Sequence, residues 1–305
     1  MRIGLDLGGT KIEVAVLTET GEFWYRHRIA TPQGDYKKTL AAVVALIHQA
    51  IEKIKNEQPD ATDPGSISVG IGLPGAISHR TGRVKNANST CLIGEDLQGD
   101  LETMLGFPIL LANDADCFTL SEAVDGAAQG GYVVMGVILG TGVGGGIAVG
   151  GKLLCGPNRI TGEWGHNPLP WPLDGERPGP PCYCGRQGCI ETFLSGPGLE
   201  KDYLRVSGLT ADARTIVQRA LEGNSSAVHV LEAYEDRLAR GLAGVINILD
   251  PDIIVLGGGL SNVARLYINV PRLLPRYVFT DHVETTVVQA RHGDSSGVRG
   301  AAWLN

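Results

Sequence analysis

The chain has 305 residues, a formal net charge of −7, 43 % apolar residues and 19 % charged residues. This composition is typical of a globular protein, and the length exceeds what a single hydrophobic core usually supports, so we expect two lobes. The acidic balance, without a block of lysine and arginine, argues against a nucleic-acid partner. No apolar run reaches the roughly 20 residues of a membrane-spanning helix, and Met1 leads directly into an apolar strand, so we expect a cytoplasmic protein without membrane association.

The N-terminal part begins with strand-like segments and continues into a helix. Ile3–Leu7, Ile12–Val16 and Phe23–Ala30 predict three short strands joined by glycine-containing turns. Apolar residues then recur at helical spacing between residues 40 and 54, and the apolar run Ile67–Leu73 predicts a buried strand. The expected order is therefore β-β-β-α-β.

A second, similar order begins near residue 132. Val133–Leu139 predicts a strand, Gly140–Gly146 a glycine-rich turn, and Ile147–Val149 a further strand. A helix with one apolar face, from Leu231 to Val245, then precedes the strand Ile253–Leu256. Two glycine-rich turns occupy corresponding places, which predicts an internal duplication with a cleft between the halves.

The domain boundaries follow from this pattern alone. We expect an N-terminal lobe of residues 1–118, completed by a C-terminal helix around residues 296–305, and a C-terminal lobe of residues 119–295. The stretch Pro168–Pro181 is rich in proline and glycine. It is therefore expected to be irregular, and either a lid or plain packing would suit it.

The first glycine-rich turn, Asp6-Leu7-Gly8-Gly9-Thr10-Lys11, joins two expected strands. Glycines let backbone N–H groups converge on an anion, so the turn suits a phosphate group. Asp6 would hold Mg²⁺ directly or through water. An ordinary glycine hairpin is the alternative interpretation.

The second turn contains a formal G-x-G-x-x-G, but a strand follows it where a dinucleotide-binding motif needs a helix. A second phosphate hairpin therefore fits it better. The glycines after Leu256 would let the backbone approach the adenosine end of a nucleotide, although a plain strand-to-helix turn remains open. The sequence has no P-loop motif. The residues expected to contact ATP are Asp6, Gly8, Gly9, Thr10, Lys11, Gly140, Thr141, Gly142, Gly144, Gly257, Gly258 and Gly259.

Three cysteines, Cys182, Cys184 and Cys189, lie within eight residues and supply soft ligands for a metal ion. A tetrahedral site needs a fourth ligand, and His166 is the best candidate, which gives the Cys₃His set of a structural zinc site. The alternative is a loop of reduced cysteines with His166 in the core. The other cysteines, at positions 91, 117 and 155, are expected to be isolated, buried thiols.

The apolar strand Ile109–Ala112 leads into Asn113-Asp114-Ala115-Asp116. Because sites in α/β proteins form at the carboxyl ends of strands, Asp114 is the candidate base that accepts a proton from an alcohol during phosphoryl transfer. The alternative is that Asn113 and Asp114 only cap the following helix. Glu163, His166 and Glu191 lie close to the cysteines in sequence and suit the binding of several sugar hydroxyls.

Taken together, these motifs resemble the ROK family of bacterial sugar kinases, within the actin and hexokinase superfamily. The segments that carry the resemblance are Asp6–Lys11, Leu111–Ala115, Leu139–Gly146, Gly162–His166, Cys182–Glu191 and Asp250–Gly259. The resemblance spans nearly the whole chain. It implies an α/β, ribonuclease H-like fold with two lobes, Mg-ATP as the phosphoryl donor, and usually a homodimer.

The resemblance also implies roles for individual residues. Asp114 falls on the catalytic base, and the zinc ligands fall on His166, Cys182, Cys184 and Cys189. One ring nitrogen of His166 would bind zinc and the other a sugar hydroxyl. The implied sugar contacts are Gly75, Asn88, Asn113, Asp114, Glu163, His166 and Glu191.

Within the family, three segments look most like bacterial fructokinases that also accept mannose: Lys85–Thr90, Glu163–Trp171 and His292–Gly297. Fructose is therefore the first expected substrate, and N-acetylglucosamine is the nearest rival, through residues 182–191 and 257–262. Some family members are repressors with a helix-turn-helix ahead of the sugar domain, and we expect no such module here because the first glycine-rich turn begins at Asp6. A sugar-sensing protein without turnover is the alternative from a different functional class.

Overall fold

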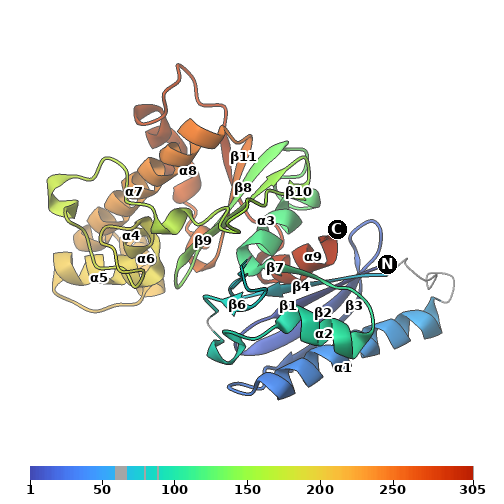
Figure 1. Ribbon diagram of the computed structural model, residues 1–305. Coiled ribbons are helices and arrows are strands. Elements are labelled where there is room, and N and C mark those ends of the chain that lie inside the picture. Colours follow the sequence, from blue (N-terminus) through green and yellow to red (C-terminus); the bar gives the residue numbers. More distant parts are fainter. Residues whose placement is uncertain (59–66, 79, 88, 305) are drawn as a thin grey trace. The chain divides into compact units, whose positions relative to one another are not determined.

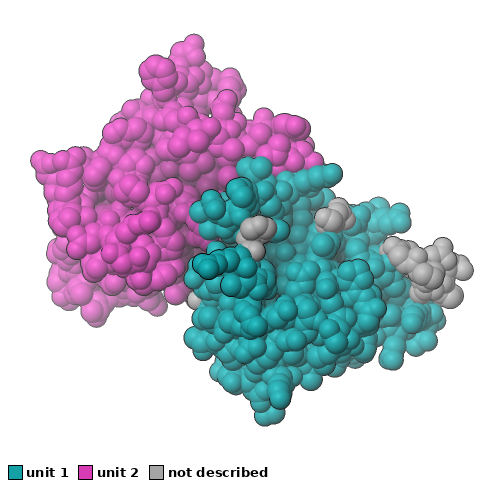
Figure 2. All heavy atoms as spheres, in the orientation of Figure 1, with its two compact units in different colours: residues 1–129, 151–161, 294–305 teal, residues 130–150, 162–293 magenta. Residues whose placement is uncertain are grey.

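The computed structural model describes residues 1–58, 67–78, 80–87 and 89–304, which divide into two compact units (Figures 1 and 2). The first unit comprises residues 1–129, 151–161 and 294–305, and the second comprises residues 130–150 and 162–293. Among the helices of these described ranges, none has both the length and the apolar character that crossing a membrane requires.

The first unit is built on a mixed sheet with strand order β3-β2-β1-β4-β7. Its principal elements are β1 (Arg2–Leu7), β2 (Lys11–Leu17), β3 (Phe23–Ala30), α1 (Tyr36–Glu57), β4 (Ser68–Leu73), β5 (Ala76–Ile77), β6 (Val84–Lys85), α2 (Leu97–Leu105), β7 (Leu110–Asn113), α3 (Asp114–Val124), β10 (Lys152–Leu153) and α9 (Ser296–Trp303). Strands β1 to β3 are antiparallel, whereas β4 runs parallel to β1 and β7 parallel to β4.

The two faces of this sheet carry different residues because side chains alternate along a strand. Ile3, Leu5 and Leu7 of β1 are buried in the core that also contains the apolar faces of α1 and α2. Helix α1 begins after Asp35, whose side chain accepts a hydrogen bond from the backbone N–H of Lys38. Figure 1 shows α1 and α2 on one face of the sheet and α9 on the other.

Helix α9 packs very closely on its face of the sheet, because the strands below it carry glycines. A Cβ atom at Gly4 would lie 2.1 Å from the carbonyl oxygen of Val298, and one at Gly70 would lie 2.0 Å from that of Ala301. This packing explains why residues 294–305, at the end of the chain, belong to the first unit. Any larger side chain at these two positions would push the helix away.

The boundary between the units differs from the division expected at residues 118 and 119. That position falls inside α3, which is one continuous helix and contacts α9 extensively. The division lies after Gln129 instead, and residues 151–161 belong to the first unit although the sequence placed them in the second. A contact between two helices that are far apart in the sequence decides this boundary, and periodicity within one helix does not reveal it.

The second unit has its own mixed sheet, in which four strands follow the order β9-β8-β11-β12. Its principal elements are β8 (Val133–Leu139), β9 (Val143–Val149), α4 (Ile190–Leu194), α5 (Gly196–Ser207), α6 (Ala213–Leu221), α7 (Ser225–Leu249), β11 (Ile253–Gly257), α8 (Leu266–Leu273) and β12 (Thr286–Gln289). The antiparallel pair β8 and β9 and the parallel pair β8 and β11 repeat the arrangement of β1, β2 and β4. The two units therefore share one topology.

The glycine-rich turn of this unit is shorter than expected. Strand β9 begins at Val143, so Gly144, Gly145 and Gly146 pair with β8 and do not belong to the turn. A Cβ atom at Gly145 would lie 3.0 Å from both the carbonyl oxygen of Gly162 and a ring carbon of Trp164. The glycines of β9 thus make room for the segment that leads to His166.

Candidate active site and metal centre

The first glycine-rich turn is held in shape by hydrogen bonds to its carbonyl groups. The backbone N–H of Gly8 donates to the carbonyl of Lys11 at 3.0 Å and closes the turn. From the end of β3, the hydroxyl of Thr31 donates to the carbonyl of Gly8 at 2.7 Å, and its N–H donates to that of Thr10 at 3.0 Å. Thr31 was not predicted from the sequence, because its role depends on the pairing of β2 with β3.

Asp6 and Asp114 lie close enough for their charges to interact. Burial, then the negative charge of Asp114, and then that of Glu13 raise the pKa of Asp6 to about 6, while Lys11 and Arg28 act in the opposite direction. A divalent cation would remove this repulsion between carboxylates, and carboxylate oxygens are ligands that Mg²⁺ prefers. The donor chemistry of this unit therefore fits the magnesium expected at Asp6.

The first turn of α9 lies beside Asp6. A Cβ atom at Gly297 would be 3.3 Å from the Oδ2 atom of Asp6. The backbone at the start of a helix favours a nearby negative charge. Local sequence does not reveal this neighbour, because residue 297 lies almost a full chain length away from residue 6.

Asn113 joins three parts of the predicted sugar site in the first unit. Its side-chain amide donates to the carbonyl of Gly75 at 2.8 Å, and its side-chain oxygen accepts from the N–H of Ala115 at 2.8 Å. Gly75 has a φ of +139°, which a residue with a side chain rarely adopts. Asn113 is thus the N-cap of α3, and it also holds Gly75 beside the first residue of that helix, Asp114.

The capping interpretation of Asn113 and the expected roles at Gly75, Asn113 and Asp114 are compatible. Asp114 occupies the first position of α3, and its Oδ1 atom accepts from the N–H of Ala115 at 2.9 Å. These three residues lie together because β4 and β7 are adjacent, with Leu73 opposite Asn113. Asn88, the other sugar contact expected in this part of the chain, lies outside the described residues.

The four expected metal ligands come together in the second unit. The ligand atoms of His166, Cys182, Cys184 and Cys189 all lie within 4.8 Å of one another. The Nδ1 atom of His166 is 3.6 Å from the sulfur of Cys182, and the sulfurs of Cys184 and Cys189 are 3.7 Å apart. Three sulfur atoms and one imidazole nitrogen form a donor set that fits tetrahedral zinc.

The backbone and the charges of this cluster also favour a cation. The N–H of Cys182 donates to the carbonyl of Arg186 at 2.8 Å, and that of Gly185 donates to the carbonyl of Cys182 at 3.0 Å, so the loop folds back on itself. Burial and then the neighbouring thiols raise the pKa of Cys189 to about 12. A metal ion would reverse this cost by pairing with the thiolates.

The remaining cysteines do not all match expectation. Cys117 is buried, but Cys91 is half-buried and Cys155 is exposed. Cys155 precedes an irregular segment that buries few residues, and local sequence does not reveal that exposure.

Tyr183 lies between two of the metal ligands in the sequence and was not predicted as a site residue. Its hydroxyl is 3.0 Å from the Nε2 atom of His166, and the two rings meet edge to face. A sugar hydroxyl at this nitrogen would therefore share it with Tyr183 or replace it. Burial, then the charges of Glu191, Cys182 and Glu163, raise the pKa of Tyr183, so the expected sugar-binding carboxylates of this unit lie near its ring.

The second glycine-rich turn is fastened to the segments that carry the metal ligands. The carboxylate of Glu191 accepts from the N–H of Val143 at 2.9 Å. The N–H of Gly196 donates to the carbonyl of Gly140 at 2.8 Å. The third glycine segment is also close, because a Cβ atom at Gly258, whose φ is +82°, would lie 2.5 Å from the carbonyl of Leu139. The glycine segments expected to bind ATP in this unit are therefore neighbours.

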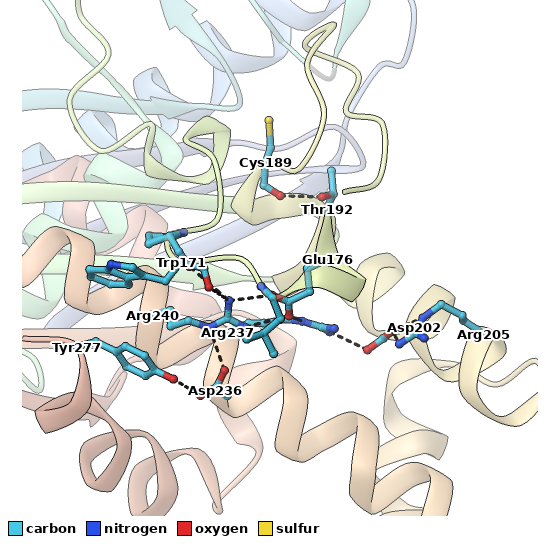
Figure 3. A network of polar contacts seen from close by, with 12 residues as sticks. Trp171, Glu176, Cys189, Thr192, Asp202, Arg205, Asp236, Arg237, Arg240 and Tyr277 are labelled. Carbon is cyan, nitrogen blue, oxygen red and sulfur yellow. Dashed lines mark hydrogen bonds and ion pairs between the residues drawn. The ribbon is translucent and has the colours of Figure 1, made fainter. Parts of the chain in front are cut away.

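The proline- and glycine-rich stretch between His166 and the cysteines is anchored to the unit's longest helix. Glu176 is buried and forms ion pairs with Arg237 and Arg240 of α7 (Figure 3). Near the start of the stretch, the ring of Trp171 stacks on that of Tyr277. Of the two interpretations left open for this stretch, these contacts favour packing over a lid.

Sequence comparisons relate the chain to known proteins along its whole length. A profile described as the ROK family matches residues 2–305. The chain is 40 % identical over 309 residues to proteins named N-acetyl-D-glucosamine kinase from Photobacterium profundum and from Vibrio cholerae. Each alignment covers 100 % of this chain and 99 % of the relative.

Solved structures share the fold. The ROK hexokinase from Thermus thermophilus matches with a TM-score of 0.84 at 30 % identity, over 99 % of this chain and 96 % of that one. A ROK family glucokinase from Streptomyces griseus, solved in complex with glucose and AMPPNP, matches with a TM-score of 0.72 at 28 % identity, over 99 % and 97 % of the two chains. These matches confirm the actin/hexokinase-like α/β fold class expected from the sequence.

Proposed function

The chain belongs to the ROK family and is an ATP-dependent sugar kinase, and we propose that its substrate is N-acetyl-D-glucosamine. The observation that carries this proposal is the name shared by the full-length relatives at about two-fifths identity. This choice replaces fructose as the first candidate.

Fructose stays the second candidate because of the specific segments that resemble fructokinases. These are residues 85–90, 163–171 and 292–297, which include the expected sugar contacts Glu163 and His166. One pocket contact to a substituent is enough to change a preference between hexoses, so identity along the whole chain does not determine it.

In the proposed mechanism Asp114 accepts the proton of the reacting sugar hydroxyl. Phosphoryl transfer needs little covalent chemistry from the protein, so the residues mainly position the reactants. Asn113 holds Gly75 in place and caps the helix that begins with Asp114. The glycine-rich turn of each unit is assigned to phosphate groups of the nucleotide. Magnesium held near Asp6 would neutralise negative charge on the transferred phosphoryl group.

We assign His166, Cys182, Cys184 and Cys189 to a structural zinc site. A closed site with four protein ligands has no open position for catalysis, so zinc would order the loop and fix the orientation of His166. The nearby Glu163 and Glu191 are assigned to sugar hydroxyls. Glu163 is exposed, whereas Glu191 is half-buried.

The test is the kcat/KM of the purified protein with Mg-ATP for N-acetylglucosamine, fructose, mannose and glucose, followed by coupled ADP release. A preference of at least tenfold for N-acetylglucosamine supports the proposal, and a similar preference for fructose replaces it with the second candidate. No turnover with any of the four sugars, together with sugar binding by calorimetry, would favour the sensor alternative.

A further inference from the structure

Glu191 is the one expected sugar ligand whose carboxylate also holds part of the nucleotide site in the described residues of the second unit. It lies in α4, two residues after the metal ligand Cys189. Its Oε2 atom accepts a hydrogen bond from the N–H of Val143, the residue that ends the turn between β8 and β9. The turn passes so close that a Cβ atom at Gly142 would be 2.7 Å from the same oxygen.

Two other contacts fix the same turn and the start of β9. The N–H of Gly196 donates to the carbonyl of Gly140 at 2.8 Å, just after α4 ends. The indole N–H of Trp164 donates to the carbonyl of Gly144 at 3.1 Å. Both of these bonds hold carbonyl oxygens, so Glu191 supplies the carboxylate that fixes the direction of an N–H group.

The direction of that N–H group matters because a turn binds phosphate through the orientation of its amides. The carbonyl of the same peptide unit accepts from the N–H of Gly140 at 3.0 Å, so the unit is held at both ends. Without an acceptor at Glu191, only the bond from Gly140 would oppose a rotation that turns the carbonyl of Gly142 toward the anion site. A negative charge next to phosphate groups is itself unfavourable. The carboxylate of Glu191 therefore favours phosphate binding only because its hydrogen bond to the N–H of Val143 stabilises the turn more than the repulsion destabilises the bound phosphate.

We propose that Glu191 is a positioning residue of the nucleotide site, which holds the β8–β9 turn in its phosphate-binding shape before any sugar arrives. This inference rests on the proposed kinase function, and it adds a second role to the sugar contact assigned to Glu191. The same carboxylate has one oxygen on the turn and a second oxygen for the sugar. It thereby links the two substrates through one rigid group.

The test measures the affinity of a non-hydrolysable ATP analogue with Mg²⁺ by calorimetry, in the absence of sugar. Glu191→Ala removes the acceptor and is expected to weaken binding about tenfold, the effect of losing one hydrogen bond to a charged group. Glu191→Gln keeps an oxygen acceptor and loses the charge, so it is expected to bind the analogue as tightly as the unmodified protein, or more tightly. If Glu191 contacted only the sugar, neither substitution would change the affinity for the ATP analogue.

Glu200→Ala is the matched control. The Oε1 atom of Glu200 accepts from the N–H of Ala213 at 3.0 Å in the same unit, so the control removes the same kind of bond at another segment. It is expected to leave the affinity for the analogue unchanged. Equal weakening by Glu200→Ala, equal weakening by both Glu191 variants, or no weakening by Glu191→Ala would each overturn the inference. If the unmodified protein failed to bind the analogue, the proposed kinase function itself would fail.

Discussion

Glu176 and Arg240 form a two-point ion pair in the interior of the second unit. The Nη1 and Nη2 atoms of Arg240 donate to the two carboxylate oxygens of Glu176 at 2.8 and 2.9 Å (Figure 3). The side chains are only 2 % and 6 % exposed, and Arg237 donates a further bond to Glu176 at 2.7 Å. This arrangement fixes the irregular stretch that leads to the metal cluster onto α7.

Glu176→Gln should destabilise the protein. Arg237 and Arg240 would keep the carboxylates of Asp202 and Asp236 but would lose the buried charge that they share, a loss of about 1–3 kcal/mol in unfolding free energy. Urea unfolding of the variant and of the unmodified protein measures this change in the free energy of unfolding. The control is Asp174→Asn in the same stretch, because Asp174 is fully exposed in its pair with Arg177 and should give no measurable change. If both variants had the same stability as the unmodified protein, the stretch would not be anchored through Glu176.

The same pair gives the protein a defined acid sensitivity. Burial would raise the pKa of Glu176, but hydrogen bonds from Arg240 and then Arg237 lower it from 4.5 to about 2. A lowered pKa in the folded state adds stability that is present above about pH 4.5 and is lost as the pH falls toward 2. Unfolding midpoints between pH 5 and pH 2.5 should therefore fall less steeply in Glu176→Gln than in the unmodified protein. Parallel curves would contradict this assignment.

Cys184→Ala should release the metal and lower the stability of the protein. Cys184 is exposed, so its truncation removes little packing, and any loss of stability reflects the metal site. Elemental analysis should find about one zinc per chain in the unmodified protein and much less in the variant, with a lower Tm, because metal binding contributes to folding. Cys155→Ala, at another exposed cysteine, serves as the control. A fully active protein without zinc would refute the assignment.

Asp114→Asn should abolish turnover and retain sugar binding. The amide is nearly the same size as the carboxylate but does not accept the hydroxyl proton, so kcat should fall by about 10²–10⁴-fold. Calorimetry should show sugar affinity within a few-fold of the unmodified protein. Asp116→Asn makes the same charge change in the first turn of α3 and should keep most of the activity. Substantial turnover in Asp114→Asn would show that another group is the base.

Asp6→Asn should stabilise the protein when no magnesium is added. The pKa of Asp6 is raised from 3.8 to about 6, so its contribution to stability is present below pH 3.8 and is lost as the pH rises through 6. The asparagine does not ionise, so the variant avoids the cost of a buried negative charge at pH 7. It should be more stable than the unmodified protein at that pH by on the order of 1–3 kcal/mol. Added magnesium should raise the Tm of the unmodified protein more than that of the variant. Equal responses to pH and to magnesium would contradict the assignment.

The local pattern of residues predicted most of the regular structure. Short apolar runs located β1, β2 and β8, which are buried along most of their length, and helical spacing located α1 and α7, which bury one face. The sequence also predicted the Cys₃His set, since three of its four ligands lie within eight residues. The corresponding positions of the two glycine-rich turns predicted the duplicated topology.

The sequence alone therefore determined many of the strands, the helices α1 and α7, the family resemblance and the candidate ligands, because these depend on spacing within short segments. It did not predict α2, α5, α6 or α8. Only the tertiary structure decided which distant residues meet: α9 with Gly4 and Gly70, Glu176 with α7, and Glu191 with Val143 across 48 positions of the chain. Such partners are set by how whole elements pack, and packing depends on shape and hydrogen-bond direction in three dimensions. A carboxylate in a sequence shows its charge but not the donor it will face.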